Sequence, residues 1–443
     1  MGLRVGMMLA LVVSAAAQTK VVTHGESSPA ALVTDPVQVA GHEGILLGPA
    51  QMRRFYGIDK IAGNTWGAGQ TVAILISHAD PYLEGDLAIF DERFGLPLCT
   101  AGNGCLRHVQ TANVGDDGSW EIKPGPPESG SRDVMLKADG KTPIPSAGET
   151  VLDVEWVHAI APAAKILLIE IPFFTWPNFL HGVDVGVAEG ATVMSMSFAE
   201  PQKDEHNMNY LRGDRHFATD KTVFVAAAGD HAHGARWPAA SPDVVGVGGT
   251  TIRTDAMGTV TFEHAWIARP AGDRFVGTGG GISAAEKEPA AQVAYGIPND
   301  AKQMRGTPDV AYYASSLTSI AVYNTAPSMS GKGEPGWRGT GGTSAGAPQW
   351  AGLLAIANSM RVLQHKVPLS QYVGNGDAGK FGKGTLAALY TVGKLHPEAF
   401  RDITEGQNGD CGAECTASVG YDYVSGLGAP LADVLVPALV ALP

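Results

Sequence analysis

Basic residues are scarce in this sequence, and charged residues of either sign are few. Of 443 residues, 31 are Lys or Arg and 44 are Asp or Glu, which gives a formal net charge of -13 at pH 7. Such an acidic chain repels nucleic acid and anionic membranes, so we expect neither as a partner. A negative surface of this kind suits work at low pH.

Long apolar runs are almost absent. One run, Val5 to Val13, follows Arg4 and precedes the small residues Ala15 to Ala17, a pattern typical of a secretory signal peptide and too short to span a bilayer. We therefore expect residues 1–17 to be a signal peptide and the chain to be secreted, to the extracellular space or periplasm, without membrane contact after cleavage. Residues 18–46 are rich in Val, Ala and Pro and are predicted to be a linker or short N-terminal extension.

Only four cysteines are present, and they fall as two close pairs, Cys99 with Cys105 and Cys411 with Cys415. Because exported chains retain disulfides, two local disulfides are predicted. Four free thiols and a four-ligand zinc site are the alternatives. The pairs stand roughly 300 residues apart, and their internal steps are not typical of zinc ligands.

Short runs rich in Val and Ile alternate with helical stretches. The runs are Gln70–Ser77, Lys165–Ile171, Ala191–Ser197, Thr222–Gly229 and Asp243–Gly248, and the helical stretches are Tyr82–Phe94, Glu149–Ile160, Asn178–Glu189 and Asp204–Ala218. Continuous apolar runs fit strands buried on both faces of a parallel sheet. The alternation predicts an α/β fold, doubly wound, with a mainly parallel sheet and helices on both faces.

Two further segments have distinct compositions. Cys99 to Ser146 is rich in Gly, Pro, Asp and Ser and is predicted to be a long loop. Leu431 to Leu442 is apolar and is predicted to be a final helix that packs on the core.

A candidate nucleophile lies in Gly341–Pro348, which reads GGTSAGAP and leads into the apolar stretch Gln349–Met360. The glycines permit a tight turn, so Ser344 is predicted at a helix N-terminus, where unpaired N–H groups and the helix dipole favour a developing negative charge. The alternative is that Thr343 or Ser344 is a simple N-cap.

Two carboxylates lie one helical turn apart in the segment AGETVLDVEWVHAIAP. Glu149 and Asp153 share a helix face, and an adjacent carboxylate pair tends to share a proton. A solvated helix face would be the ordinary interpretation. Here the segment is apolar almost all round, which indicates that the pair is buried.

Another acidic residue, Asp230, follows a predicted buried strand through Gly229. The mouth of a parallel sheet is where ligands and reacting groups gather. A turn residue or a helix N-cap is the alternative for Asp230.

These features together resemble the sedolisin family of serine-carboxyl peptidases, which have a subtilisin-like fold. The resemblance runs from about Leu47 to Leu442. Its motifs are GETVLD at Gly148–Asp153, AIAPAAKI at Ala159–Ile166, AAAGD at Ala226–Asp230, WPAASP at Trp237–Pro242, TGGGIS at Thr278–Ser283, PDVA at Pro308–Ala311, GGTSAGAP, and DITEGQNG and GYDYVSGLGAP near the C-terminus. It implies a peptidase domain over residues 47–443 that acts as a monomer on polypeptide substrates.

The resemblance also implies roles. Ser344 is the nucleophile, Glu149 its general base, Asp153 the group that orients Glu149, and Asp230 the acid that stabilises the oxyanion. The chemistry is consistent, since a serine needs a base within reach and a glutamate of pKa about 4.3 is matched to an acidic medium. Asp230 donates to an oxyanion only when protonated.

One Ca²⁺ ion is implied as well, in the segment 402–428. The resemblance assigns Asp402 and Asp422 as carboxylate ligands and Ile403, Ser418 and Gly420 as carbonyl ligands, an oxygen set that suits a hard cation. An Asp-rich turn without metal is the alternative.

Two other functions compete with this one. A subtilisin-type Asp-His-Ser peptidase needs a histidine on a helix, for which His181-Gly182 is the only superficial candidate, and the expected HGTH-type pattern is absent. The other is an exported, calcium-stabilised domain that has lost catalysis and kept a binding role.

The chain departs from the family at several points. The connection His231–Arg236 is short, Ser197-Phe198-Ala199 stands where relatives often carry Ser-Trp-Gly or Ser-Leu-Gly, and Gly346 replaces the usual Ser or Val; these changes are expected to bear on specificity. Only residues 18–46 lie between the expected signal peptide and the start of the resemblance, so we expect no large N-terminal prosegment of the kind usual in the family. We expect the chain to fold without a covalent inhibitor domain, with a prosegment acting in trans as the alternative.

Overall fold

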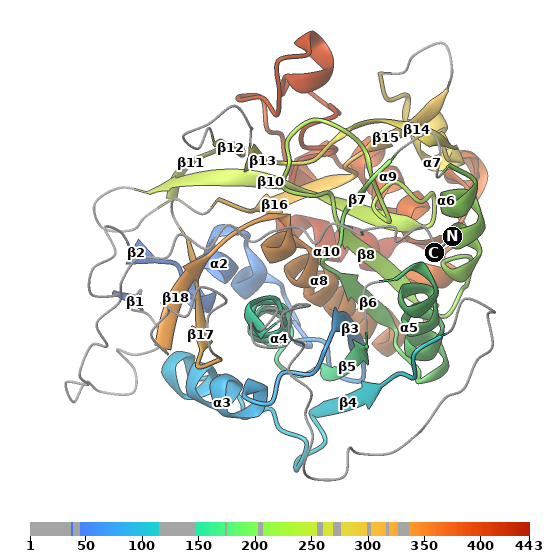
Figure 1. Cartoon of the computed structure of the whole chain (residues 1–443). Coiled ribbons are helices and arrows are strands. Elements are labelled where there is room, and N and C mark those ends of the chain that lie inside the picture. Colours follow the sequence, from blue (N-terminus) through green and yellow to red (C-terminus); the bar gives the residue numbers. More distant parts are fainter. Residues whose placement is uncertain are drawn as a thin grey trace, which may run out of the picture.

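A parallel β-sheet forms the centre of the molecule (Figure 1). The computed structural model describes residues 37–38, 45–114, 147–172, 175–202, 207–254, 260–268, 276–298, 303–315, 319–326 and 336–443. Six parallel strands follow in the spatial order β4 (Leu106–Gln110), β5 (Lys165–Ile171), β3 (Thr71–Ser77), β6 (Val193–Met196), β8 (Val223–Ala227) and β10 (Val244–Thr254). Beyond β8, β10 pairs in parallel with β16 (Val310–Tyr313) and antiparallel with β11 (Val260–Ala265).

Side chains on each strand alternate between the two faces of the sheet, and both faces are buried. On β3, Val72, Ile74 and Ile76 belong to one core, whereas Ala73 and Leu75 belong to the other. This two-sided burial explains why the strands are continuous apolar runs in the sequence. The predicted doubly wound α/β fold, with a mainly parallel sheet, is confirmed.

Helices cover both faces. The larger core lies against α2 (Pro49–Phe55), α3 (Leu83–Phe94), α4 (Ala147–Ile160), α8 (Thr343–Leu363) and α10 (Ala432–Ala441), and the smaller core lies against α5 (Trp176–Ala188) and α6 (Asn207–Gly213). Figure 1 shows α4, α8 and α10 on one side of the sheet and α5 and α6 on the other. The apolar C-terminal helix predicted over Leu431–Leu442 is confirmed as α10.

Two predicted elements differ from the structure. The segment predicted as one helix over Asp204–Ala218 is described from residue 207, and there α6 is followed directly by a 3-10 turn, Asp214–His216. Gly213, between the two, keeps right-handed helical backbone angles. The segment predicted as a loop from Cys99 contains the edge strand β4, in which Leu106 is buried, Arg107 is exposed and the other three residues are half-buried, so that it has no continuous apolar run to detect. Residues 115–146 of that predicted loop lie outside the described residues.

The remaining strands are short pairs around this framework. They are β1 (Val37–Gln38) with β2 (Ile45–Leu46), β7 (Glu200–Pro201) with β9 (Arg236–Trp237), β12 (Ile267–Ala268) with β13 (Val276–Gly277), β14 (Gly281–Lys287) with β15 (Met304–Thr307), β17 (Ile320–Asn324) with β18 (Gly336–Thr340), and β19 (Phe400–Arg401) with β20 (Ala429–Pro430). Two more helices, α7 (Ala290–Tyr295) and α9 (Gly384–Leu395), pack on each other.

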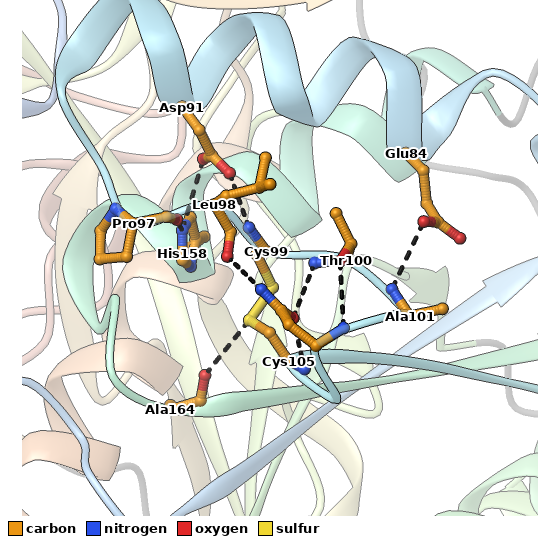
Figure 2. The surroundings of a disulfide bond; sticks show 11 residues. Glu84, Asp91, Pro97, Leu98, Cys99, Thr100, Ala101, Cys105, His158 and Ala164 are labelled. Carbon is orange, nitrogen blue, oxygen red and sulfur yellow. Dashed lines mark hydrogen bonds and ion pairs between the residues drawn. A yellow bond between two sulfur atoms is a disulfide. The ribbon is translucent and has the colours of Figure 1, made fainter.

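Both predicted disulfides are present. Cys99 is bonded to Cys105 and Cys411 to Cys415, and since all four cysteines lie in the described part of the chain, no thiol is left free and the zinc and free-thiol alternatives are wrong. Figure 2 shows the first disulfide beside Asp91 of α3, which accepts a hydrogen bond from Cys99 N at 3.0 Å, and His158 of α4, which donates to the Pro97 carbonyl at 2.7 Å. The disulfide thus lies where the chain leaving α3 contacts α4.

The predicted signal peptide, residues 1–17, lies outside the described residues, as does most of the predicted linker. Within the described ranges, no helix combines the length and apolar character needed to cross a bilayer.

Candidate active site

Ser344 is the second residue of α8, as the sequence predicts, and its side chain is fully buried. The chain reaches α8 from β18 through Gly341 and Gly342. A Cβ atom on Gly342, whose φ is +97°, would lie 2.5 Å from Asp230 Oδ2, and one on Gly341 would lie 2.6 Å from the Ala314 carbonyl oxygen. Only glycine fits both positions, so the GGTS turn brings Ser344 close to Asp230.

The N-cap of α8 is Gly342, which has no side chain to cap the helix. Asp230 takes over this task from another segment. Its Oδ1 accepts hydrogen bonds from Thr343 N at 2.8 Å and from Thr343 Oγ1 at 2.7 Å. The simple interpretation of Thr343 or Ser344 as an N-cap is therefore wrong, whereas Asp230 does act as a cap, on a helix 113 residues away.

Asp230 has a second carboxylate oxygen with a different environment. Oδ2 has no hydrogen-bond partner among the described residues and lies against Gly342. Burial raises the pKa of Asp230, while the Thr343 hydrogen bonds and the charge of Arg236 lower it. The Thr343 contacts hold the carboxyl group in place, and Oδ2 remains available to carry a proton.

Glu149 and Asp153 lie one turn apart on α4, which packs directly on α8. Both side chains are buried, with 6% and 0% of their surfaces exposed, so the alternative of a solvated helix face is wrong. Burial raises the pKa of both carboxyl groups, and the charge of Glu149 raises that of Asp153 further. Two carboxylates in this relationship share protons and titrate as a pair.

The Ser344 hydroxyl acts on Glu149 and lowers its pKa. The two side chains do not form a well-aligned hydrogen bond, since neither Ser344 Oγ nor either Glu149 carboxylate oxygen has a partner among the described residues. In enzymes without bound substrate, such bonds are often long and tighten when the substrate binds. The structure thus brings together Ser344, Glu149, Asp153 and Asp230, all buried, from three separate segments.

Sequence reasoning missed one contact of this group. Ser197 directly follows β6, and its Oγ donates a hydrogen bond to Asp153 Oδ1 at 2.8 Å and lies 3.5 Å from the Ser344 carbonyl oxygen. Ser197 also lowers the pKa of both Glu149 and Asp153. The sequence shows Ser197 in the motif Ser197-Phe198-Ala199, but from the sequence alone that motif was expected to affect substrate specificity.

His181, the histidine that a subtilisin-type triad would require, lies on α5 and belongs to the opposite face of the sheet from α8. It cannot act on Ser344. This arrangement argues against the Asp-His-Ser alternative.

The residues predicted to bind calcium come from two segments that meet in one turn. Gly420 N donates to Asp402 Oδ2 at 2.9 Å, and Ser418 N donates to Asp422 Oδ2 at 2.8 Å. Asp422 Oδ1 accepts from the main chain of Val424 and Ser425. Neither aspartate forms a salt bridge within the described part of the chain. Two carboxylates without a cationic partner and the carbonyl groups of the same turn fit a hard cation.

Comparisons with known proteins give the subtilase family and relatives of the sedolisin type. The model of the subtilase family matches residues 145–366. The chain is 30% identical over 334 residues to kumamolisin from Bacillus sp. (strain MN-32), an alignment that covers 69% of this chain and 54% of kumamolisin. It is 29% identical over 194 residues to sedolisin from Pseudomonas sp. (strain 101), covering 43% of this chain and 28% of sedolisin.

A more distant relative aligns over more of the chain. Tripeptidyl-peptidase 1 from Dictyostelium discoideum is 24% identical over 426 residues, covering 88% of this chain and 58% of that protein. The chain therefore spans little more than half the length of kumamolisin and of tripeptidyl-peptidase 1. Its fold is similar to that of Pseudomonas sedolisin in complex with two molecules of pseudo-iodotyrostatin, with a TM-score of 0.66, 22% identity, and coverage of 89% of this chain and 97% of that chain.

Proposed function

The chain is a sedolisin-type member of the subtilase family, and we propose that it is a serine-carboxyl endopeptidase that hydrolyses polypeptides at acidic pH. The observation that carries this proposal is the meeting of Ser344 with two buried acidic centres, the Glu149–Asp153 pair on α4 and Asp230 after β8. A serine, a base and an acid in one place are the groups that acyl transfer requires.

The Glu149–Asp153 pair supplies the base. When the pair holds a single proton, its remaining negative charge lets Glu149 take the proton of the Ser344 hydroxyl as Oγ attacks the scissile carbonyl carbon. Glu149 then returns this proton to the leaving amine, the C–N bond breaks, and an acyl-enzyme remains. Water, deprotonated by Glu149, attacks the acyl-enzyme and releases the second product, and the proton returns to Ser344.

Asp153 orients the base. Its Oδ1 is held by the Ser197 hydroxyl, so Oδ2 is the oxygen available to Glu149. Because one proton lies between two buried carboxyl groups, ionisation of both is unfavourable, and the pair carries at most one negative charge over the acidic range. This property suits an acid-acting peptidase.

Asp230 supplies the acid. When protonated, its Oδ2 donates a hydrogen bond to the oxygen that becomes negative as Ser344 attacks. The raised pKa of Asp230 extends the pH range in which this proton is present. Above that range the carboxylate would repel the oxyanion, and turnover would fall.

We also propose that Asp402 and Asp422, with the carbonyl groups of Ile403, Ser418 and Gly420, hold one Ca²⁺ ion. The support is that Ser418 N and Gly420 N, two residues apart, donate hydrogen bonds to Asp422 and Asp402, and that neither carboxylate has a cationic partner in the described residues. The ion would tie residues 402–403 to residues 418–422 and stabilise the folded state.

Secretion through residues 1–17 is part of the same proposal. It is supported by the N-terminal sequence pattern and by the two disulfides, which are typical of exported proteins.

The experiment is an assay of the purified chain on a denatured protein at about pH 4, with Ser344→Ala as the control, followed by mass spectrometry of the products. We expect internal cleavage by the wild type and none by the variant. Equal cleavage by both proteins would show that Ser344 is not the nucleophile. Binding of the polypeptide without cleavage would favour the alternative of a non-catalytic binding domain.

A further inference from the structure

The short connection that follows Asp230 pairs with a second segment, which begins at Gly277. Gly277 N donates to the Asp230 carbonyl at 3.1 Å, and Ala232 N donates to the Gly277 carbonyl at 3.0 Å. Further along, Gly234 N donates to the Gly280 carbonyl at 2.7 Å, and Gly280 N donates to the Gly234 carbonyl at 3.3 Å. The main chain of Asp230 is therefore one end of a run of hydrogen bonds that joins these two segments.

Ala232, within this run, has an unusual main-chain conformation. Its φ of +59° lies in the left-handed region, which residues other than glycine seldom adopt. Such a conformation persists when the surrounding contacts hold it in place. Without them the connection would relax at Ala232 and shift Asp230, which lies two residues earlier in the chain. The connection therefore needs support from other parts of the molecule.

A third segment, the loop 405–417, contacts both of the others. One carboxylate oxygen of Glu414, Oε1, accepts a hydrogen bond from His233 Nε2 at 3.0 Å and another from Ile282 N at 3.2 Å. His233 lies in the connection after Asp230, and Ile282 lies in the segment with which this connection pairs. A single oxygen thus joins the two segments, just beyond the run of hydrogen bonds that begins at Asp230.

Asn408, in the same loop, makes a second set of contacts with these two segments. Its carbonyl oxygen accepts a hydrogen bond from His233 N at 2.8 Å, and its Nδ2 donates to the Gly280 carbonyl at 3.5 Å. Asn408 is fully buried. Its own N donates to the Cys415 carbonyl at 2.9 Å, beside the turn that the Cys411–Cys415 disulfide closes. The loop that holds the connection is therefore itself held by a covalent bond.

The loop and the connection also pack closely together. A Cβ atom on Gly409 would lie 3.0 Å from Cys415 Sγ and 3.0 Å from His233 Cβ, so even a methyl group there would push the loop away. The His233 and Glu414 side chains, in contrast, have 38% and 34% of their surfaces exposed. Their removal leaves no cavity in the core, so both can be substituted in a folded chain.

We propose that Glu414, His233 and Asn408 are positioning residues, through which the loop 405–417 holds Asp230 where it can donate to the oxyanion. This inference rests on the peptidase function proposed above and extends it to a loop that supplies no group to the acyl-transfer step. A donor stabilises an oxyanion only when it lies about 3 Å from the position that the oxygen takes in the transition state. A small displacement of Asp230 is therefore enough to reduce turnover.

Glu414→Ala removes both hydrogen bonds of the shared oxygen. With a quenched fluorescent peptide at about pH 4, kcat should fall about tenfold and KM should stay within about twofold, because an oxyanion donor acts in the transition state and not on the bound substrate. Glu414→Gln, whose amide oxygen still accepts both bonds, should restore kcat to within about twofold of the wild type. Glu398→Ala is the matched control, since Glu398 makes a similar bond of 3.2 Å to His396 at exposed positions.

Two double variants test whether the loop acts through Asp230. His233→Ala/Glu414→Ala should have the kcat of Glu414→Ala, because the bond that His233→Ala removes is already lost. In single turnovers with excess enzyme, Glu414→Ala should cause no further loss in the Asp230→Ala background, since no acid is left to position. An effect of Glu414→Ala on KM alone would assign Glu414 to substrate contacts, and an undiminished loss in the Asp230→Ala background would assign it to general stability. Either result would overturn the proposal.

A second measurement does not require turnover. Hydrogen exchange of the main-chain amides of residues 229–236, followed by mass spectrometry, should be at least about fivefold faster in Glu414→Ala than in the wild type and unchanged in Glu398→Ala. An inactive wild type with this faster exchange in Glu414→Ala would contradict the peptidase function alone. An active wild type, with exchange and kcat both unchanged in Glu414→Ala, would contradict the role of the loop alone.

Discussion

Thr343 donates both its main-chain N–H and its hydroxyl group to Oδ1 of Asp230, and the next residue of α8 is Ser344. The first turn of the helix thus fixes the position of Asp230 relative to Ser344. The same hydroxyl accepts a hydrogen bond from Gly229 N at 2.9 Å, which fixes the main chain on the other side of Asp230. Oδ2 of Asp230 is left without a partner in the described part of the molecule.

Thr343→Val should reduce kcat/KM about tenfold, because it removes one of the two hydrogen bonds that hold Asp230 while keeping the shape of the side chain. Loss of this bond also raises the pKa of Asp230, so the alkaline limb should move to higher pH. Thr343→Ser, which keeps the hydroxyl group, is the matched control in steady-state assays. Equal activity of Thr343→Val and the wild type at all pH values would contradict this role.

Ser344→Ala and Glu149→Gln should each remove most of the turnover. Because the proposed nucleophile and its proposed base would act as one unit, the double variant should be little worse than either single variant. Glu155→Gln is the control, because Glu155 is also buried on α4 but accepts a hydrogen bond from Tyr323 N, which a glutamine can still do. Single-turnover rates check this expectation, and additive losses would show that Ser344 and Glu149 work independently.

Ser197→Ala should reduce kcat/KM at the acidic end of the pH profile. The Ser197 hydroxyl stabilises the ionised carboxyl pair, so its removal raises the pKa of Glu149 and Asp153 and lowers the fraction of ionised pair at a given acidic pH. The acidic limb of kcat/KM should move up by about half to one pH unit. Ser197→Thr should restore it, and a limb that stays in place in Ser197→Ala would assign Ser197 to substrate contacts only.

Chelation of calcium should lower the melting temperature, and added calcium should restore it. An ion that binds only the folded state adds about 2.7 kcal/mol when its free concentration is about 100 times Kd. Asp422→Ala should abolish the response in calorimetry, whereas Asp410→Ala, an exposed change in the same C-terminal segment, should keep it. A melting curve of the wild type that is insensitive to chelator would mean that the turn holds no calcium.

Stability should increase as the pH falls from about 8 to about 4, and Asp80 should account for part of this change. Burial raises the pKa of Asp80 to about 6 in the folded chain, above the unfolded value, so the folded state binds its proton more tightly. The stabilisation is complete below about pH 4 and is lost as the pH rises through about 6.

Asp80→Asn tests that account, because asparagine keeps the shape and removes the charge. The variant should equal the wild type at about pH 4 and exceed it by about 2 kcal/mol at about pH 8, as measured by urea unfolding. The exposed Asp377→Asn change should leave the pH dependence of unfolding as it is. Parallel stability curves for Asp80→Asn and the wild type would show that Asp80 does not contribute.

The sequence by itself determined the framework of this protein. The strands β3 and β5 were predicted to within one residue, because strands buried on both faces are continuous apolar runs. The placement of Ser344 in the first turn of α8 followed from two glycines ahead of an unbroken apolar stretch, and the shared face of Glu149 and Asp153 followed from their spacing of four. Both disulfides followed from short spacings. All of these features depend on residues close together in the chain.

Only the tertiary structure decided which distant groups meet. Asp230 caps a helix that begins at Thr343, Ser197 holds Asp153, and Arg236 folds back across Gly229. The edge strand β4, which is largely polar, was also decided by pairing with β5. The physical reason is that such contacts depend on strand register and on the packing of side chains from separate segments, which hydrophobic periodicity does not encode.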